Sequence, residues 1–147
     1  MCRQITPENP RSPSALSTPR CLLSCATESL GCAPGEIIVL RVAGEVDLCT
    51  LPTLQTALDH GLDQYPTHLV VDLAQMTFCC VGGLGLLTRT RHTAARNATS
   101  YTVSGMRPHI DRLWTRLWDG DLPVRCCSTA VALTAIWSGQ RALADDP

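Results

Sequence analysis

The chain has 147 residues, a formal net charge of −1 and nine cysteines, and all twelve of its basic residues are arginine. This length suits a single domain with a proper hydrophobic core. A nucleic-acid binder normally carries a basic excess, and the lack of lysine excludes a Walker-type phosphate lysine and a Schiff-base nucleophile.

The cysteines indicate a reducing compartment. Their number is odd, and most lie inside or beside apolar runs. Neither a signal peptide nor a membrane-spanning run is visible, so we expect a cytoplasmic protein without membrane insertion whose cysteines are mostly small buried residues. Cys21, Cys25 and Cys32 form no paired CxxC knuckle and the four histidines are scattered, so we expect no metal and no cofactor.

The two ends of the chain differ in composition from its centre. Residues 1–20 contain four prolines among small polar residues, which predicts a disordered tail. We expect one folded domain over residues 21–141 and a polar tail over residues 142–147.

The folded part begins with a predicted hairpin. Residues 21–27 are an expected edge strand, and residues 28–35, with two glycines and a proline, are the expected turn after it. Residues 36–42 have a high β-branched content and are predicted as the second strand. Thr50 and Pro52 then mark the start of a helix whose leucines recur every three or four residues.

A buried strand and a glycine-containing segment follow. Residues 68–73 are aliphatic and are predicted to form a strand buried on both faces. Residues 76–87 contain three glycines, which we interpret as a tight turn into a helix. Such a turn would leave backbone amides uncovered at the positive end of the helix dipole, so it is a place to present a binding surface.

The remaining elements continue to alternate. Residues 100–104 are a predicted strand, residues 122–127 are another, and Ser128 caps a final helix expected to end near Trp137. Between those strands, a helix begins near Pro108 with one apolar stripe: Ile110, Leu113, Trp114, Leu117 and Trp118. We expect its two tryptophans in the core or at its partly buried rim. The order β-β-α-β-α-β-α-β-α predicts an α/β fold, mostly parallel, with the first hairpin at one edge.

Three motifs in this order resemble the STAS domain of bacterial anti-sigma-factor antagonists. They are VLRVAGEVD at residues 39–47, LVVDL at residues 69–73, and the segment from Thr77-Phe78 to Gly83-Leu84-Gly85. The resemblance runs from about residue 21 to about residue 138. It implies a four- to five-stranded mixed sheet with about four helices, and a protein that is not an enzyme but docks a kinase-fold anti-sigma factor and so releases a sigma factor.

The chain departs from the family pattern where family members are phosphorylated. Family members read Asp-Ser-Ser before Gly-Leu-Gly, where this chain has Cys80, Val81 and Gly82. Val81 stands at the phosphoacceptor position and has no hydroxyl, so no phosphorylation is expected there. Because a phosphate would add about −1.5 to −2 charges, the uncharged segment resembles the unmodified, binding-competent state. The resemblance implies these partner-binding residues: Asp47, Cys49, Cys80, Val81, Gly82, Gly83, Leu84 and Gly85.

Some of these residues have simpler interpretations. Asp47 could equally be a helix cap or turn residue. Cys80 precedes a helix N-terminus, where the dipole favours the thiolate, and family geometry would bring Cys49 near it. Cys49, Cys79 and Cys80 are therefore candidates for a redox switch in place of phosphorylation. We favour the plainer alternative, that these cysteines only fill apolar space, because free cysteine is commonly buried and inert.

Three classes of function remain open. The leading one is an anti-sigma-factor antagonist that acts by docking. The second is a ligand-sensing or lipid-transport-associated member of the same fold. The third is a cysteine-dependent redox enzyme, supported only by Cys79 and Cys80 and lacking a CxxC motif. The oligomeric state and the identity of the partner stay open.

Overall fold

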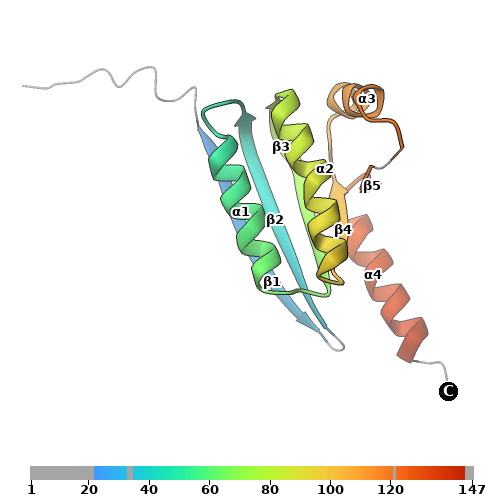
Figure 1. The fold of residues 1–147 in the computed structure, drawn as a ribbon. Helices are drawn as coiled ribbons and strands as arrows, with labels where there is room; N and C mark the ends of the chain where they lie inside the picture. The colour runs from blue at the N-terminus through green and yellow to red at the C-terminus, as the bar shows by residue number, and fades with distance from the viewer. Residues whose placement is uncertain (1–21, 33–34, 121, 145–147) are drawn as a thin grey trace, which may run out of the picture.

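The computed structural model describes residues 22–32, 35–120 and 122–144, so the predicted N-terminal tail lies outside the described residues. Strands and helices alternate in the order β1 (Leu23–Cys32), β2 (Gly35–Val46), α1 (Leu51–Asp63), β3 (His68–Cys79), α2 (Val81–Arg96), β4 (Ser100–Ser104), α3 (Pro108–Leu117), β5 (Val124–Cys126) and α4 (Thr129–Ala144) (Figure 1). The sheet order is β1-β2-β3-β4-β5, antiparallel between β1 and β2 and parallel elsewhere. The predicted α/β fold with its hairpin at one edge is confirmed.

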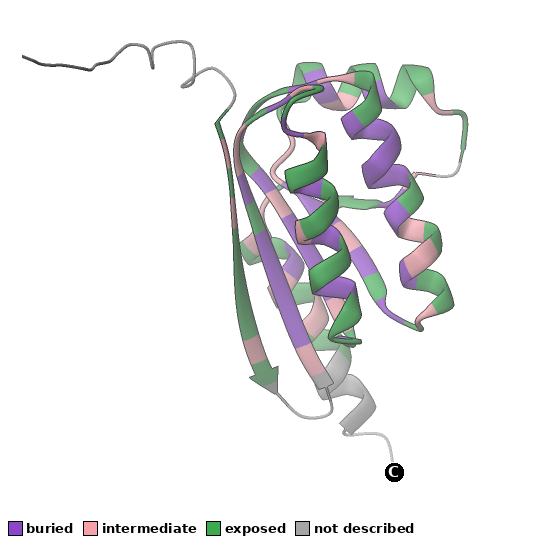
Figure 2. Ribbon diagram, turned by 60° about the vertical axis from the view of Figure 1, so that its left-hand side comes forward, coloured by how far each residue is buried: buried purple, intermediate pink, exposed green. Residues whose placement is uncertain are grey.

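The sheet is the middle layer of three. Helices α1 and α2 lie side by side across one face, and α4 lies on the other (Figure 1). A large apolar cluster fills the space between the sheet and the helices α1, α2 and α3, and a smaller one lies under α4. Successive residues of β3 alternate between them, because Leu69 and Val71 belong to the first cluster and Val70 to the second. This confirms the strand predicted to be buried on both faces (Figure 2).

The hairpin is longer than predicted. Residues 28–31, expected to be part of a turn, continue β1 and pair with residues 36–39 of β2. An edge strand packs against one neighbour only and tolerates the small and polar residues of this stretch. The charged side chain of Glu28 stays at the surface and forms an ion pair with Arg41 at 2.6 Å. The residues that the glycine and proline signal assigned to a turn therefore belong in part to β1.

Near its end, β2 passes close to the start of β1 at Gly44. This glycine has a φ of +113°, and a Cβ atom there would lie 2.5 Å from the carbonyl oxygen of Leu22. Only glycine combines that backbone conformation with so close an approach. The pairing between β2 and β3 changes register on both sides of Gly44, so the ladder is irregular where β2 approaches its end.

Two helices differ from the prediction. Helix α4 continues past Trp137 to Ala144, through the start of the predicted polar tail. Gly139 costs a helix about 1 kcal/mol relative to alanine, but the residues after it are mostly good helix formers. Helix α3 begins at Pro108 as predicted, yet Leu113 and Leu117 of its apolar stripe are exposed. None of the helices in the described part of the chain is long and apolar enough to cross a membrane.

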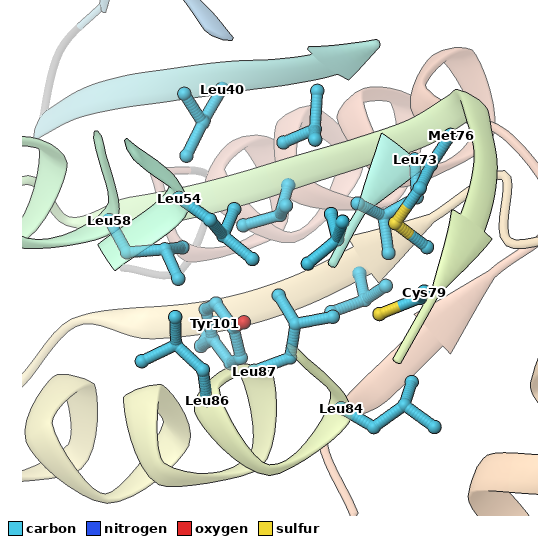
Figure 3. Close-up of a cluster of buried hydrophobic side chains, with 14 of the residues drawn as sticks. Leu40, Leu54, Leu58, Leu73, Met76, Cys79, Leu84, Leu86, Leu87 and Tyr101 are labelled. Atoms are coloured by element: carbon cyan, nitrogen blue, oxygen red, sulfur yellow. The ribbon is translucent and has the colours of Figure 1, made fainter. Parts of the chain in front are cut away.

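The main cluster contains one polar atom without a partner. Tyr101 belongs to this cluster, and its ring lies beside Leu86 and Leu87 of α2 (Figure 3). The Tyr101 hydroxyl is buried and has no hydrogen-bond partner among the described residues. Burial also raises the pKa of this phenol well above its usual range. A buried polar group that lacks a partner costs roughly 1–3 kcal/mol of desolvation.

The substitution Tyr101→Phe removes that hydroxyl and keeps the ring. We expect it to raise the free energy of unfolding by about 1 kcal/mol, because the buried group loses no hydrogen bond. Urea denaturation measures the change, and Tyr65→Phe is the matched control because Tyr65 is 71% exposed. A destabilised Tyr101→Phe protein would mean that the hydroxyl has a partner.

Candidate functional site

The junction between β3 and α2 has no loop. The strand runs to Cys79, Cys80 is the N-cap, and the helix begins at Val81. The Cys80 amide donates to the Val46 carbonyl oxygen at 2.9 Å, and the Cys80 carbonyl accepts from the Leu84 amide at 3.1 Å. The predicted glycine turn is therefore wrong, because its three glycines lie inside the first turns of α2.

Gly83 has a packing role instead. A Cβ atom at this position would lie 2.7 Å from both the Cys79 Sγ and the Val46 Cγ1 atoms. These two residues pair across the ends of β3 and β2. The missing side chain therefore lets the first turn of α2 rest directly on the two strand ends.

Cys79 belongs to the core. Its side chain is buried, and Figure 3 shows its sulfur pointing toward the apolar cluster. Burial, and to a lesser extent the neighbouring Cys80, raises the pKa of the Cys79 thiol to about 12. At neutral pH this thiol is protonated and is a poor nucleophile. Of the three cysteines considered for redox chemistry, Cys79 is the one that the structure disfavours.

Asp47 and Thr50 build the turn that leads into α1. One carboxylate oxygen of Asp47, Oδ1, accepts hydrogen bonds from the amides of Cys49 at 2.9 Å and Thr50 at 3.0 Å. The Thr50 hydroxyl accepts from the Asp47 amide at 2.9 Å and donates to the Glu45 carbonyl oxygen at 2.8 Å. Thr50 occupies the N-cap as predicted, but its side chain makes no cap hydrogen bond. The first amide of α1, that of Leu51, donates to the backbone carbonyl oxygen of Asp47 at 2.9 Å.

The starts of α1 and α2 lie beside each other at one end of the molecule, where β2 and β3 end (Figure 1). A Cβ atom at Gly82 would lie 3.1 Å from the Leu51 Cδ1 atom, so the two first turns are in contact. Leu48 is 81% exposed and Val81 is 56% exposed. Cys49 and Gly82 are exposed as well. We refer to Leu48, Cys49, Val81 and Gly82 as the helix-start surface.

Several residues predicted to bind a partner are covered. Leu84 is fully buried in the main cluster, and Gly83 and Gly85 are also buried. Cys80 is half-buried and packs against that cluster. The reason is the direct junction, which places these residues inside the helix and against the sheet. The sequence interpretation also missed Leu48, whose signal is an apolar residue within an otherwise polar turn.

The helix-start surface can present two kinds of group to a binding partner. Leu48 and Val81 supply exposed apolar area, and the Cys80 side chain at the N-cap accepts no hydrogen bond from the first turn of α2. Within the described residues, no group of three or more His, Cys, Asp or Glu side chains could hold a metal ion. The arrangement suits binding through shape and backbone hydrogen bonds.

Comparisons with known proteins agree with one another. The family model described as "Mlab, STAS domain" matches residues 33–117. The anti-sigma-F factor antagonist RsfB of Mycobacterium tuberculosis is 30% identical over 105 residues, which cover 71% of this chain and 84% of that protein. Among solved structures, an anti-sigma factor antagonist from Mycobacterium paratuberculosis has a TM-score of 0.56 and 24% identity, covering 76% of this chain and 93% of its own. The anti-sigma factor antagonist SpoIIAA in its unphosphorylated form has a TM-score of 0.57 and 16% identity, covering 78% and 99%.

The substitution Gly83→Ala tests the contact beneath α2. We expect it to lower the free energy of unfolding by about 1–3 kcal/mol, since the new methyl group overlaps the Cys79 and Val46 side chains. The matched control is Gly139→Ala in α4, where nothing lies within 4 Å of the added Cβ atom and a gain of about 0.5–1 kcal/mol is expected. Denaturant midpoints of both variants provide the comparison. Equal effects would mean that α2 can shift to accept the methyl group at no cost.

Proposed function

The chain belongs to the STAS domain family, and on this premise we propose that it is an anti-sigma-factor antagonist. In this role it docks a kinase-fold anti-sigma factor and releases the sigma factor that this partner holds. The relative from Mycobacterium tuberculosis supports the proposal, because its name states such a role and the match covers most of its length. The observation that carries the proposal is the exposed, uncharged helix-start surface.

The make-up of this surface supports docking. Leu48 and Val81 are large apolar side chains that the fold leaves in water. A partner that covers them gains about 25 cal/mol for each Å² of apolar area removed from water. The uncapped amides of α2 can donate to acceptors on the same partner. Cys49 and Gly82 add small uncharged groups, so the surface presents no charge of its own.

Val81 removes the hydroxyl through which this surface would be phosphorylated. The resemblance to antagonists aligns Val81 with a serine that is phosphorylated, and valine has no oxygen to accept a phosphoryl group. We therefore infer that docking is not switched off by phosphorylation at this position. Without a phosphate, the negative charge that would repel a partner never arises.

Asp47 has a proposed second role at the edge of the helix-start surface. Its Oδ1 atom holds the turn, while Oδ2 has no hydrogen-bond partner among the described residues. The side chain is partly exposed. A cationic group of the partner can pair with Oδ2 without breaking the turn, so the structural and the partner-facing interpretations are compatible.

Substitutions of Val81 test this docking. Val81→Glu should weaken binding to the anti-sigma factor about tenfold or more, or about 1.4 kcal/mol, because it buries a charge in the interface. Val81→Ala should bind nearly as well as the parent protein. Isothermal titration calorimetry with each kinase-fold anti-sigma factor of the source genome measures the affinities. Val131→Glu is the matched control, because Val131 is 48% exposed on α4.

Two results would contradict this proposal. Equal binding by Val81→Glu and the parent would place the interface elsewhere on the protein. No binding of the parent to any kinase-fold anti-sigma factor would favour the ligand-sensing or lipid-transport-associated role.

Redox control through Cys49 and Cys80 stays a prediction. Both thiols are free, Cys49 is exposed and Cys80 is half-buried. A peroxide could join the two sulfurs, taking two electrons and two protons from the thiols and being reduced to water or alcohol. We then expect peroxide-treated parent protein to bind its partner less tightly, and Cys80→Ala to be unaffected. Equal calorimetric affinities for both proteins, with and without reductant, would remove redox control.

A further inference from the structure

Helix α3 has an apolar flank that the fold does not cover. Ile110 and Trp114 are buried, but Leu113 is 39% exposed and Leu117 is 47% exposed. The two exposed leucines are four residues apart and so lie one turn apart on the same side of the helix. They are available to a partner without any change in the core.

This flank is firmly held. The Trp114 Nε1 group donates to the Thr88 hydroxyl of α2 at 2.9 Å in a buried hydrogen bond. One turn before Trp114, Asp111 forms an ion pair with Arg125 at 2.6 Å. Helix α3 is therefore fixed to α2 and to β5, and the exposed leucines are not the result of a loosely packed helix.

Arginines border the two leucines. Arg112 and Arg116 are exposed and also lie one turn apart, and the structure records no ion pair for either with the described residues. Asp111, the acidic residue of this helix, is already neutralised by Arg125. The flank thus combines apolar side chains with uncompensated positive charge.

Acidic and basic residues are unevenly distributed along the chain. Residues 22–80 contain seven acidic residues and one arginine, whereas residues 81–144 contain eight arginines and three acidic residues. A net charge of −1 conceals this separation. The half of the chain that includes α2 and α3 is therefore complementary to an acidic partner.

The end of α3 packs near the start of α2. A Cβ atom at Gly85 would lie 3.5 Å from the Trp118 ring and 3.5 Å from an Arg89 guanidinium nitrogen. Trp118, directly after α3, therefore covers α2 one turn after Val81. Trp118 thus links the end of α3, next to Leu117, to the first turns of α2 that begin at Val81.

We propose that this α3 flank, formed by Leu113, Leu117, Arg112 and Arg116, is a second part of the docking surface and binds an acidic segment of the partner. The proposal rests on the proposed antagonist function. The segment presents apolar side chains to the two leucines and carboxylates to the two arginines. A helix of the partner that is acidic along one side of an apolar stripe fits this description.

Two sets of variants test the flank, each with a matched control. The double substitution Leu113→Ser and Leu117→Ser removes the apolar contacts, and Arg112→Glu with Arg116→Glu reverses the charge. Calorimetric titration of the full chain with its anti-sigma factor should show at least a tenfold loss of affinity for each pair. Val131→Ser on α4 and Arg96→Glu in the last turn of α2 are exposed controls, expected within twofold of the parent.

The outcomes separate this inference from the proposed function. If Val81→Glu abolishes binding and both α3 pairs bind like the parent, the α3 proposal is overturned and the antagonist function stands. If the parent binds no anti-sigma factor, both are overturned. Analytical ultracentrifugation gives the remaining test: a parent dimer that the leucine pair converts to a monomer would mean that a second copy covers the flank, which also overturns the proposal. The charge-reversal pair lies at exposed positions, so it tests the flank even if the leucine pair fails to fold.

Discussion

The contact between α2 and the ends of β2 and β3 controls the geometry of the proposed binding end. Gly83 lies against Val46 and Cys79, and the Cys80 amide bonds to the Val46 carbonyl oxygen. These contacts leave no room for a connecting loop, so the helix starts where the strand stops. The position of Val81 at the first residue of α2 follows from this contact.

The fold was predictable because its signals are local. Pro108 marks the first residue of α3, Ser128 accepts a hydrogen bond from the Val131 amide at the start of α4, and the aliphatic run of β3 is buried on both faces. The site was harder to predict. Three glycines within four residues are typical of a turn, and only the strand ends beneath Gly83 explain why they lie in a helix. The exposure of Leu113 and Leu117 likewise depends on how α3 packs against α2, which helical periodicity does not determine.

The proposed binding end has the fold of the family but a different side chain at position 81. Its backbone arrangement, a turn held by Asp47 beside an uncapped helix start, depends on hydrogen bonds that do not involve the residue at position 81. The identity of that residue can therefore change without disturbing the arrangement. The cysteines divide in a similar way, since Cys79 serves packing while Cys49 stays accessible to solvent. The buried and the accessible cysteines thus lie within one small region of the molecule.

The separation of acidic and basic residues along the chain has a consequence beyond contact. In Figure 1 α1 and the strands β1 and β2, which hold most of the acidic residues between residues 22 and 80, lie on one side of the molecule, and α3 lies on the other with α2 between them. The two signs of charge are therefore unevenly distributed across the molecule. The electric field of a charged partner exerts a torque on such a molecule and rotates it before the two surfaces make contact. At physiological salt this torque acts over about 8 Å, the Debye length, and so biases the last stage of approach. A protein with almost no net charge can in this way still be oriented by electrostatic forces before it contacts another surface.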